Sequence, residues 1–392
     1  MIEFKISAPG KVILYGEHAV VYGKTAVAAS LNLRTTLKFA ELPPNSEDVI
    51  RIEFPDVKLY LNFPLCVFFD YFFGNNFHYS LSKDELHSHV KDFIDSIEHV
   101  IDKNNSDTLI EQQRSSLQAF FYLLVYIAYE EHINIEETPF CVHLSTELTV
   151  NSGLGSSASF AVCLAACFLH WSRLQKGEHY TFNKDELDKI SKYALNCERI
   201  MHESPSGIDN SVCTYGSIIK FQNKLLVDVI PQVPDLKILL VNTNVVRSTK
   251  EQVKNAAELK NLYPSIVIPV LDSIDALSNH AWQTLNEISE LEVSGSTKED
   301  RHTTLSRLIY MNQGLLKALS VSHPKLEVIC ALAMTHSYAG KLTGAGGGGY
   351  AYILLPKDAD SESIKIFTKQ LEEKDFEVTM TSLGCSGVII EH

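Results

Sequence analysis

The sequence predicts a mixed α+β protein built from two domains, and three observations support that prediction. The chain has 392 residues, more than a single hydrophobic core usually holds. Segments with strand-like and with helix-like spacing occur in both halves. Between the halves lies "VIPQVPD", residues 229–235, whose two prolines interrupt regular structure. We therefore expect one domain over residues 1–230 and a second over residues 231–392, whose last strand is a candidate for packing back on the first.

Composition argues against several classes of protein. Hydrophobic residues make up 45% of the chain and charged residues 21%, as in ordinary globular proteins. The formal net charge is −14 and no lysine- or arginine-rich block occurs, so we expect no nucleic-acid partner and no hold on anionic lipid. We expect no apolar run long enough to span a bilayer, and "MIEFKISAPGK" lacks the pattern of a signal peptide. A cytoplasmic protein without a membrane partner is the expectation.

The eight cysteines include no CxxC pair, so structural zinc is not expected. Several lie in apolar runs, as Cys163 and Cys167 do. In a reducing compartment such thiols behave as small buried hydrophobes.

In the first half, hydrophobic spacing predicts strands, helices and one uninformative region. Short β-branched runs with glycine breaks predict strands at a sheet edge that feed a loop, and a segment that is apolar almost all round predicts a buried helix. In chain order we expect edge strands within 4–41, helical spacing over 83–105 inside the uninformative region 42–110, a buried helix over 115–132, a strand over 140–148, and helices over 156–174 and 184–203.

In the second half, a new strand follows the proline-containing joint, and several helices precede a final group of strands. In chain order we expect a strand over 236–245, helices over 249–262, 265–290, 300–319 and 325–337, a strand after the glycine run at 344–349, and strand pattern over 376–392.

A glycine-rich loop, "NSGLGSS" at 151–157, joins the strand at 140–148 to the helix that follows. The first turn of a helix has unpaired backbone N–H groups and the positive end of the helix dipole, so it attracts phosphate. Gly153 and Gly155 would allow close approach, and Ser156 and Ser157 add hydroxyls for phosphate or Mg²⁺. The alternative is a tight turn with a serine helix cap. The loop matches neither the Walker A pattern nor GxGxxG.

A second glycine-rich loop, "TGAGGGG" at 343–349, runs directly into strand-like sequence. A run of glycines costs conformational entropy on folding, so it usually marks a place where a ligand or another backbone comes close. The alternative is a flexible surface linker.

Three charged residues are candidates for a site at these loops. Lys11 begins an apolar strand, where a lysine is a poor choice unless it faces a cleft or an acid. Glu198 lies in a predicted helix, and Asp209 follows the turn "SPSGI". Two acids on either side of such a turn suit two different tasks, one binding Mg²⁺ and the other taking part in proton transfer near a nucleophile. The alternatives are an exposed lysine at a strand end and solvated or capping acids.

Three segments, "SAPGKVILYGEHAVVYG", "SGLGSSASFAVCLAA" and "KLTGAGGGGYAYIL", resemble the three motifs of the GHMP small-molecule kinase superfamily and occur in its order. The resemblance implies an N-terminal domain like domain 2 of ribosomal protein S5, a ferredoxin-like C-terminal domain and an active site in the cleft between them. It also implies a homodimer.

The resemblance assigns roles to residues that match the motifs. It implies that Asp209 and Lys11 are catalytic and that Ser157 and Glu198 bind Mg²⁺. The implied ATP-binding residues are Lys11, Asn151, Ser152, Gly153, Leu154, Gly155, Ser156, Ser157, Ala158, Gly344, Ala345 and Gly346. The implied substrate-binding residues are Glu17, His18, Asp209, Arg247 and Thr249.

Longer segments, among them "SKYALNCER" and "ERIMHESPSGIDN", resemble the branch of the superfamily that acts on mevalonate. This implies ATP-dependent phosphorylation of the 5-hydroxyl of mevalonate, an early step in making isoprenoid and sterol precursors. One departure occurs before the second motif, where Val150 and Asn151 replace the usual proline and glycine. Asparagine tolerates left-handed backbone geometry, so Asn151 can replace that glycine.

Two alternatives remain open from the sequence. Other GHMP kinases, such as phosphomevalonate kinase, homoserine kinase or galactokinase, share the loops, although the sugar-binding signature of galactokinase is not seen. The second alternative is a nucleotide-binding sensor of the same fold without turnover, against which Lys11, Glu198 and Asp209 argue.

Overall fold

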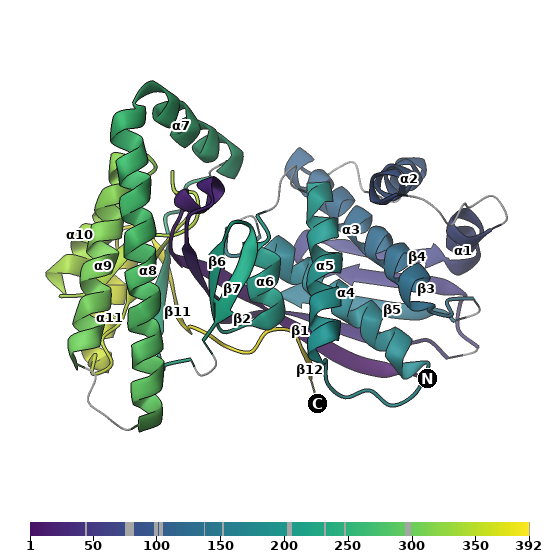
Figure 1. Ribbon diagram of the computed structural model, residues 1–392. Coiled ribbons are helices and arrows are strands. Elements are labelled where there is room, and N and C mark those ends of the chain that lie inside the picture. The colour runs from purple at the N-terminus through teal and green to yellow at the C-terminus, as the bar shows by residue number, and fades with distance from the viewer. Residues whose placement is uncertain are drawn as a thin grey trace.

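The protein consists of two lobes that lie side by side, each built on one β-sheet (Figure 1). The mixed α+β class predicted from the sequence is confirmed. The computed structural model describes residues 1–43, 45–74, 82–97, 101, 105–136, 138–150, 153–201, 206–230, 233–246, 248–294 and 299–391.

The first lobe contains an eight-stranded sheet. Its strand order is β12-β1-β2-β5-β3-β4, and β6 and β7 extend it from β2. The described pairings are antiparallel except that of β3 with β5. The strands are β1 (Glu3–Tyr15), β2 (Ala26–Glu41), β3 (Val49–Phe54), β4 (Leu59–Pro64), β5 (Phe140–Thr146), β6 (Ile218–Gln222), β7 (Leu225–Val229) and β12 (Ile389–Glu391).

β1 and β2 lie inside this sheet, so the expectation of edge strands within 4–41 was wrong. On its outer side β1 pairs with β12, with Ile6 opposite Ile390. Arg34 on β2 fixes this return of the chain, because its Nη2 donates to the carbonyl oxygens of Ser7 at 3.0 Å and Gly387 at 2.7 Å. The partner strand comes from the other end of the chain, where no local pattern could indicate it.

Helices cover one face of the first sheet. α4 and α6 pack on β1 and β2, and α3 and α5 flank α4 (Figure 1). Two shorter helices, α1 and α2, lie at the β3–β4 end. The bounds are α1 (Leu65–Phe73), α2 (Lys83–Ser96), α3 (Asp107–Glu131), α4 (Ser156–Leu174), α5 (Lys184–Met201) and α6 (Ile208–Tyr215), with the short 3₁₀ helices η1 (Ala19–Tyr22) and η2 (Pro55–Val57).

α4 is the one helix among the described residues that is long and apolar enough to cross a membrane. The expectation that no apolar run reaches this length was therefore wrong. However, 78% of its most apolar window is buried inside the protein. Cys163 and Cys167 are among the buried residues, and burial raises the pKa of the Cys163 thiol to about 12, which confirms the expectation that they pack as hydrophobes. α4 is a core helix.

The second lobe contains a four-stranded antiparallel sheet in the order β11-β8-β10-β9. Counted along the chain this order is 4-1-3-2, the arrangement of the ferredoxin-like fold that the resemblance implied. α9 and α10 pack on β9, and α11 packs on β11. The bounds are β8 (Lys237–Asn242), α7 (Thr249–Leu262), α8 (Pro264–Ser294), α9 (Glu299–Ala318), α10 (Pro324–Thr335), β9 (Ala339–Leu342), β10 (Tyr350–Leu354), α11 (Ser361–Glu372) and β11 (Glu377–Ser382).

The two lobes share a hydrophobic cluster and direct hydrogen bonds. Val12 and Leu14 of β1 belong to the same buried cluster as Leu240 of β8 and Tyr352 of β10. The Tyr352 hydroxyl donates to the Leu14 carbonyl oxygen at 3.0 Å. The carboxyl-terminal part of β1 is therefore packed against the second sheet.

Spacing predicted the long elements and missed the short ones. The helices expected over 156–174 and 249–262 match α4 and α7 in both bounds. The elements that were not predicted are β3, β4, β6, β7, β9, α1, α6 and α11. α6 has only eight residues and most of them are buried, so it offers no amphipathic period.

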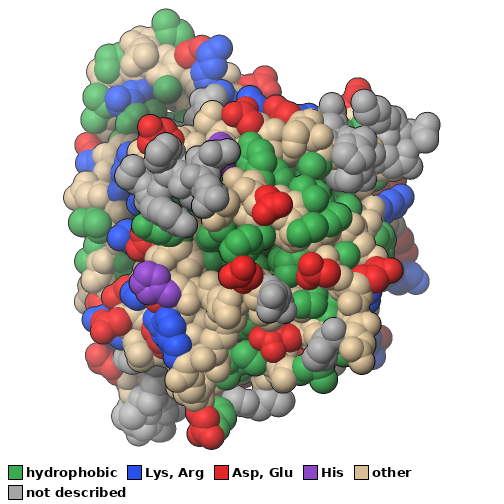
Figure 2. Space-filling view, turned by 90° about the vertical axis from the view of Figure 1, so that its right-hand side faces the viewer, with side chains coloured by type: hydrophobic (Ala, Val, Ile, Leu, Met, Phe, Trp, Pro, Cys, Tyr) green, Lys and Arg blue, Asp and Glu red, His purple; other side chains and the backbone are tan. Residues whose placement is uncertain are grey.

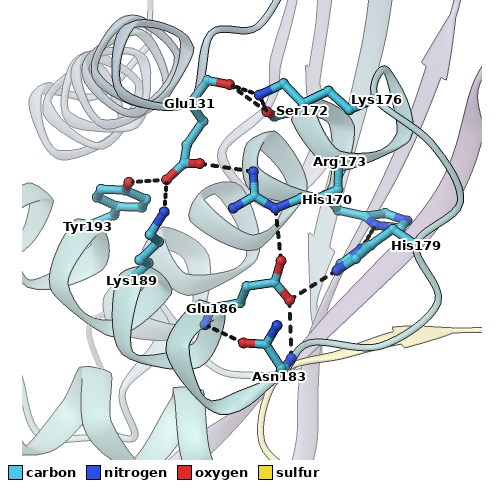
Figure 3. Close-up of polar contacts among 10 residues, drawn as sticks. All are labelled: Glu131, His170, Ser172, Arg173, Lys176, His179, Asn183, Glu186, Lys189 and Tyr193. Atoms are coloured by element: carbon cyan, nitrogen blue, oxygen red, sulfur yellow. Dashed lines mark hydrogen bonds and ion pairs between the residues drawn. The ribbon is translucent and has the colours of Figure 1, made fainter.

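An ion-pair network joins the ends of α3, α4 and α5 (Figure 3). Arg173 lies between two carboxylates, with Nη1 2.9 Å from Glu131 Oε2 and Nε 2.9 Å from Glu186 Oε1. Lys189 and Tyr193 of α5 also contact Glu131, each at 2.7 Å. Because α4 begins at the glycine-rich loop, this network anchors the end of the helix farthest from that loop.

Acid is expected to weaken this network and to destabilise the fold. Burial raises the pKa of Glu131, but hydrogen bonds from Lys189, Tyr193 and Arg173 outweigh it and hold the pKa below the ordinary 4.5. Burial also raises the pKa of Glu186, but hydrogen bonds from His179 and Arg173 outweigh this effect and hold the pKa below 4.5. A lowered folded-state pKa gives stability that is present above 4.5 and lost as the pH falls through the folded value.

Urea unfolding from pH 7 to pH 3 measures this effect. Glu131→Gln should lose about 2 kcal/mol of unfolding free energy at pH 7 and show a shallower acid decline than the wild type. If the unfolding free energy of both proteins fell in parallel as the pH was lowered, Glu131 would not be a source of the acid sensitivity.

Figure 2 shows the end of the first lobe where β4 and α1 lie. Hydrophobic side chains gather at the centre of this face, with acidic side chains among them. Tyr60 of β4 and Val67 of α1 are exposed large hydrophobics here, at 67% and 47%. Basic side chains lie mainly toward its margins, in keeping with the net negative charge of the chain.

Candidate active site

The glycine-rich loop packs directly on Lys11. The backbone N–H of Lys11 donates to the Leu154 carbonyl oxygen at 2.8 Å, which joins β1 to the loop. Gly155 has a φ of +79°, and a Cβ there would lie 2.7 Å from Lys11 Cγ. A side chain at this position would therefore be both strained and in collision with Lys11.

α4 begins at this point with its first turn facing the loop. Gly155 is the N-cap residue, so the alternative of a serine helix cap was wrong. Ser159 begins the helical bonding by donating its N–H to the Gly155 carbonyl oxygen, and its hydroxyl donates to Ala8 of β1, both at 2.8 Å. A glycine N-cap brings no capping side chain, which leaves the helix N-terminus suited to an anion.

The other residues expected in this loop lie around the same turn. Gly153 is exposed with a φ of +83°, Leu154 and Ala158 are buried, and Ser156 and Ser157 are partly exposed. Asn151 and Ser152 lie outside the described residues.

Lys11 and Asp209 form an ion pair beside the loop. Lys11 Nζ lies 2.9 Å from Asp209 Oδ1, and the side chains are 6% and 34% exposed. Asp209 is in the first turn of α6, where the helix dipole favours a carboxylate. α6 packs on β1 and α4, and this packing brings the two residues together.

Glu198 adds a second carboxylate to this group. It lies on α5 and is only 4% exposed. Burial, reinforced by the negative charge of Asp209 and opposed by Lys11, raises the pKa of Glu198 to about 8. The structure therefore brings Lys11, Asp209 and Glu198 into one electrostatic cluster, as the sequence predicted.

A buried carboxylate beside another carboxylate favours a bound cation. Among the described residues, no group of three or more His, Cys, Asp and Glu side chains could hold a metal ion by itself. Mg²⁺ needs no such group, because it usually takes one or two protein oxygens and completes its shell with water and substrate phosphates. Glu198, with the Ser157 hydroxyl at the start of the adjacent helix, fits that requirement.

The loop at 343–349 is fixed by packing, so the alternative of a flexible linker was wrong. Gly346 has a φ of +72°, and a Cβ there would lie 2.0 Å from the Val321 carbonyl oxygen. The Gly347 N–H donates to the same oxygen at 2.8 Å. Ala345 is buried, and its carbonyl oxygen accepts a hydrogen bond from His18.

His18 and Glu17 lie between the two lobes. His18 Nε2 is 2.9 Å from the Ala345 carbonyl oxygen, so it joins the first motif to the third. The Glu17 side chain is completely buried, and its two oxygens contact Lys341 and Asn312. The structure thus places Glu17 inside the protein, one residue from His18.

The remaining expected substrate residues lie at the start of α7. Thr249 is its first residue and is exposed. Gln252, three residues further on, lies where a Cβ on Gly347 would meet its side chain at 2.5 Å, so this end of α7 borders the third motif. Arg247 lies outside the described residues.

Sequence reasoning missed Lys341 and Asn312. Lys341 occurs within the third motif, but only residues 344–346 of that motif were considered as site residues. The signal was the one that identified Lys11, a lysine in an otherwise apolar strand. Asn312 lies inside a helical pattern and gave no signal.

Gly155→Ala is expected to weaken ATP binding for two reasons. An alanine is strained in the left-handed backbone conformation of this residue, and its Cβ would collide with the Lys11 side chain. The Michaelis constant for ATP should rise about tenfold, corresponding to 1–2 kcal/mol. Steady-state kinetics with varied ATP measures this. Gly314→Ala, in α9 with open space around the added methyl, is the control and should leave that constant unchanged. An unaltered constant in Gly155→Ala would contradict the role of the loop.

Comparison with known proteins identifies the family. The chain matches the family described as GHMP kinases N terminal domain over residues 121–217 and GHMP kinases C terminal over residues 294–367. It is 34% identical over 396 residues to the mevalonate kinase of Bos taurus, covering 98% of this chain and 94% of the relative. The chain belongs to the mevalonate kinase family. The mevalonate kinase of Arabidopsis thaliana is 32% identical, with 99% and 100% covered.

Solved structures agree on the fold of this family. The mevalonate kinase of Methanococcus jannaschii superposes with a TM-score of 0.69 at 23% identity, with 98% of this chain and 99% of that chain covered. A phosphomevalonate kinase from Streptococcus pneumoniae reaches 0.62 at 14% identity, with 97% and 100% covered. At such identities the superpositions show the shared GHMP kinase fold. The distinction between mevalonate kinases and other members comes from the full-length sequence relatives.

Proposed function

We propose that this chain transfers the terminal phosphate of ATP to the 5-hydroxyl of mevalonate, with Asp209 and Lys11 as its catalytic residues. The observation that supports this most directly is the 2.9 Å Lys11–Asp209 pair at the N-terminus of α4, in a member of the mevalonate kinase family. The reaction belongs to isoprenoid and sterol precursor synthesis.

Asp209 orients the substrate hydroxyl and accepts its proton as the bond to phosphorus forms. Its side chain is one-third exposed, whereas that of Lys11 is nearly buried, so the carboxylate is the accessible member of the pair. The Lys11 ammonium lies beside the attacking oxygen and offsets negative charge on the transferring group. Phosphoryl transfer needs mostly alignment and charge stabilisation, and these two groups supply both.

The ATP phosphates bind at the loop of residues 153–157 and the first turn of α4. Gly155 leaves room for Lys11 to pack against the loop, and the first backbone N–H groups of α4 have no partner within the helix and can bind phosphate. Gly344, Ala345 and Gly346 close over the phosphates from the second lobe. The carbonyl oxygen of Ala345 is already held by His18.

Glu198 and Ser157 hold the Mg²⁺ that accompanies ATP. When bound, the ion neutralises phosphate charge during transfer. Glu198 is suited to this task because its burial leaves the carboxylate short of solvent and in need of a cation.

The carboxylate of mevalonate needs a donor in addition to Lys11. The Nε2 of His18 donates to Ala345, because a carbonyl oxygen only accepts. His18 is the candidate for this donor, because the bond to Ala345 places it beside the third motif. The family resemblance gives Arg247 and Thr249 as further candidates for binding the substrate, and Thr249 is the first residue of α7.

ADP release measured with mevalonate, phosphomevalonate, galactose and homoserine tests the proposal. Mevalonate alone should give turnover. Turnover with another of these alcohols would assign the chain to a different GHMP kinase activity, and ATP binding without turnover would indicate a sensor.

The resemblance also supports a homodimer in the cytoplasm. Light scattering after size-exclusion chromatography should give twice the 43.9 kDa mass of the chain. A monomer mass at micromolar concentration would refute the dimer without affecting the proposed reaction.

A further inference from the structure

Lys341 is a completely buried lysine at the junction of the two lobes. Its side chain has no exposed surface, and its ammonium pairs with the Glu17 carboxylate, which is also unexposed. Nζ donates to the Leu342 carbonyl oxygen at 2.7 Å and lies 5.2 Å from the centre of the Tyr352 ring. Burial lowers the pKa of Lys341 and the negative charge of Glu17 opposes this effect.

Glu17 is held from a second side by α9. Its Oε2 accepts a hydrogen bond from Asn312 Nδ2 at 3.2 Å. The residue after Lys341 is also tied to α9, because the Leu342 N–H donates to Gln313 Oε1 at 2.9 Å. The carboxylate, the ammonium and α9 thus form a closed set of contacts between the end of β1 and the start of the third motif.

Each member of the ion pair is close in the chain to a residue of the candidate active site. His18 follows Glu17, and Thr343 and Gly344 follow soon after Lys341. Thr343 Oγ1 donates to the Ile13 carbonyl oxygen at 2.9 Å, and His18 Nε2 contacts the Ala345 carbonyl oxygen at 2.9 Å. The pair is therefore close in the chain to two contacts that join the first and third motifs.

Burying two charges is costly, and apolar side chains of similar size usually give equal or greater stability. Stability alone is thus a weak reason for a lysine and a glutamate here. An ion pair differs from an apolar contact in its directionality, because it fixes one register of the two segments.

We propose that Lys341 is a positioning residue for phosphoryl transfer, which holds Glu17 and thereby aligns His18 on the substrate side with the Gly344–Gly346 loop on the phosphate side. Lys341 touches neither substrate. The inference rests on the proposed function, since alignment is of use only if both segments border the reacting groups.

A double-mutant cycle tests this role with Glu17→Gln, Lys341→Met and the double variant. Each single change should lower kcat for mevalonate by about 10- to 100-fold, the effect of a misalignment of about 1 Å, while the affinity for a nonhydrolysable ATP analogue stays near that of the wild type. The double variant should lose no more activity than the worse single variant, because both changes remove one contact. If the kcat losses of the two single variants multiplied in the double variant, the proposal would be overturned, because Glu17 would then act on the substrate independently of Lys341.

Stability separates positioning from packing. The double variant removes both charges together and should regain most of the thermal stability that Lys341→Met loses, yet keep the low kcat. Recovery of kcat along with stability would show that the pair serves packing only. Glu17→Gln keeps the shape of the side chain and removes only the charge that pairs with Lys341, so it is the variant that folds if the others do not. Wild-type kcat in Glu17→Gln would also overturn the proposal.

Glu131→Gln is the matched control, because it breaks a buried ion pair at the far end of α4. That end is about 25 Å from the glycine-rich loop along the 19-residue helix. This variant should lose stability and keep kcat.

Amide hydrogen exchange gives a readout that does not depend on turnover. Exchange over residues 342–350 should become faster in Lys341→Met and Glu17→Gln and stay unchanged in Glu131→Gln. A wild-type chain without turnover of mevalonate would refute the proposed function, and the exchange result would still decide the alignment role.

Discussion

Asp209→Asn is expected to abolish the turnover of mevalonate while ATP still binds. The amide cannot accept the hydroxyl proton, and the loss of a general base lowers rates by about 10²- to 10⁴-fold. In the proposed mechanism the ATP phosphates bind at the loop of residues 153–157 and the first turn of α4, and Asp209 lies outside both, on α6. A coupled ADP-release assay measures kcat, and titration with a nonhydrolysable ATP analogue measures the affinity.

The control for this variant removes an acid of α5 that contacts the other end of α6. Asp188 accepts a hydrogen bond from the Tyr215 hydroxyl at 2.6 Å, and Tyr215 is the last residue of that helix. Asp188→Asn should keep wild-type kcat. A wild-type rate in Asp209→Asn would remove Asp209 from the mechanism.

Lys11→Met is expected to lower kcat by about 10²- to 10³-fold with the fold intact. Methionine suits a side chain that is 6% exposed, so the chain should fold, but no positive charge remains beside the transferring phosphate. Steady-state kinetics measures the loss, and a thermal melt checks the fold.

Lys5 is the matched lysine for this test, because it lies on the same strand and is exposed. Lys5→Met should keep both kcat and the melting temperature. If Lys11→Met retained kcat within a few-fold of the wild type, charge stabilisation by this lysine would be refuted.

The parts of the site that lie in continuous sequence could be predicted. The glycine spacing of residues 153–155 indicated a helix start bare of side chains, and Gly155 occupies that position against Lys11. Lys11 itself was identifiable, because an ammonium in an apolar strand needs an acid partner. Its grouping with Asp209 as a catalytic residue followed from the family resemblance, since the two residues are far apart in the chain and no spacing relates them.

Glu17 shows where reasoning from sequence stopped. Its place beside His18 in the first motif implied a contact with substrate, and the structure buries its carboxylate against Lys341 and Asn312. Whether a loop carboxylate points into the protein or toward the substrate depends on which charged groups the rest of the fold places near it. That charge comes from β9, more than three hundred residues further along the chain.

Local pattern was sufficient for most of the long helices and for the glycine-rich turns, and it made Lys11 and Asp209 candidates, because period, backbone freedom and charge are properties of neighbouring residues. Three features were decided by the three-dimensional packing alone. β12 pairs with β1, α4 is buried in the core of the protein, and Lys341 forms an ion pair with Glu17. These outcomes depend on contacts between segments from opposite ends of the chain. Their free energy comes from burial and charge pairing that exist only after both segments have folded together.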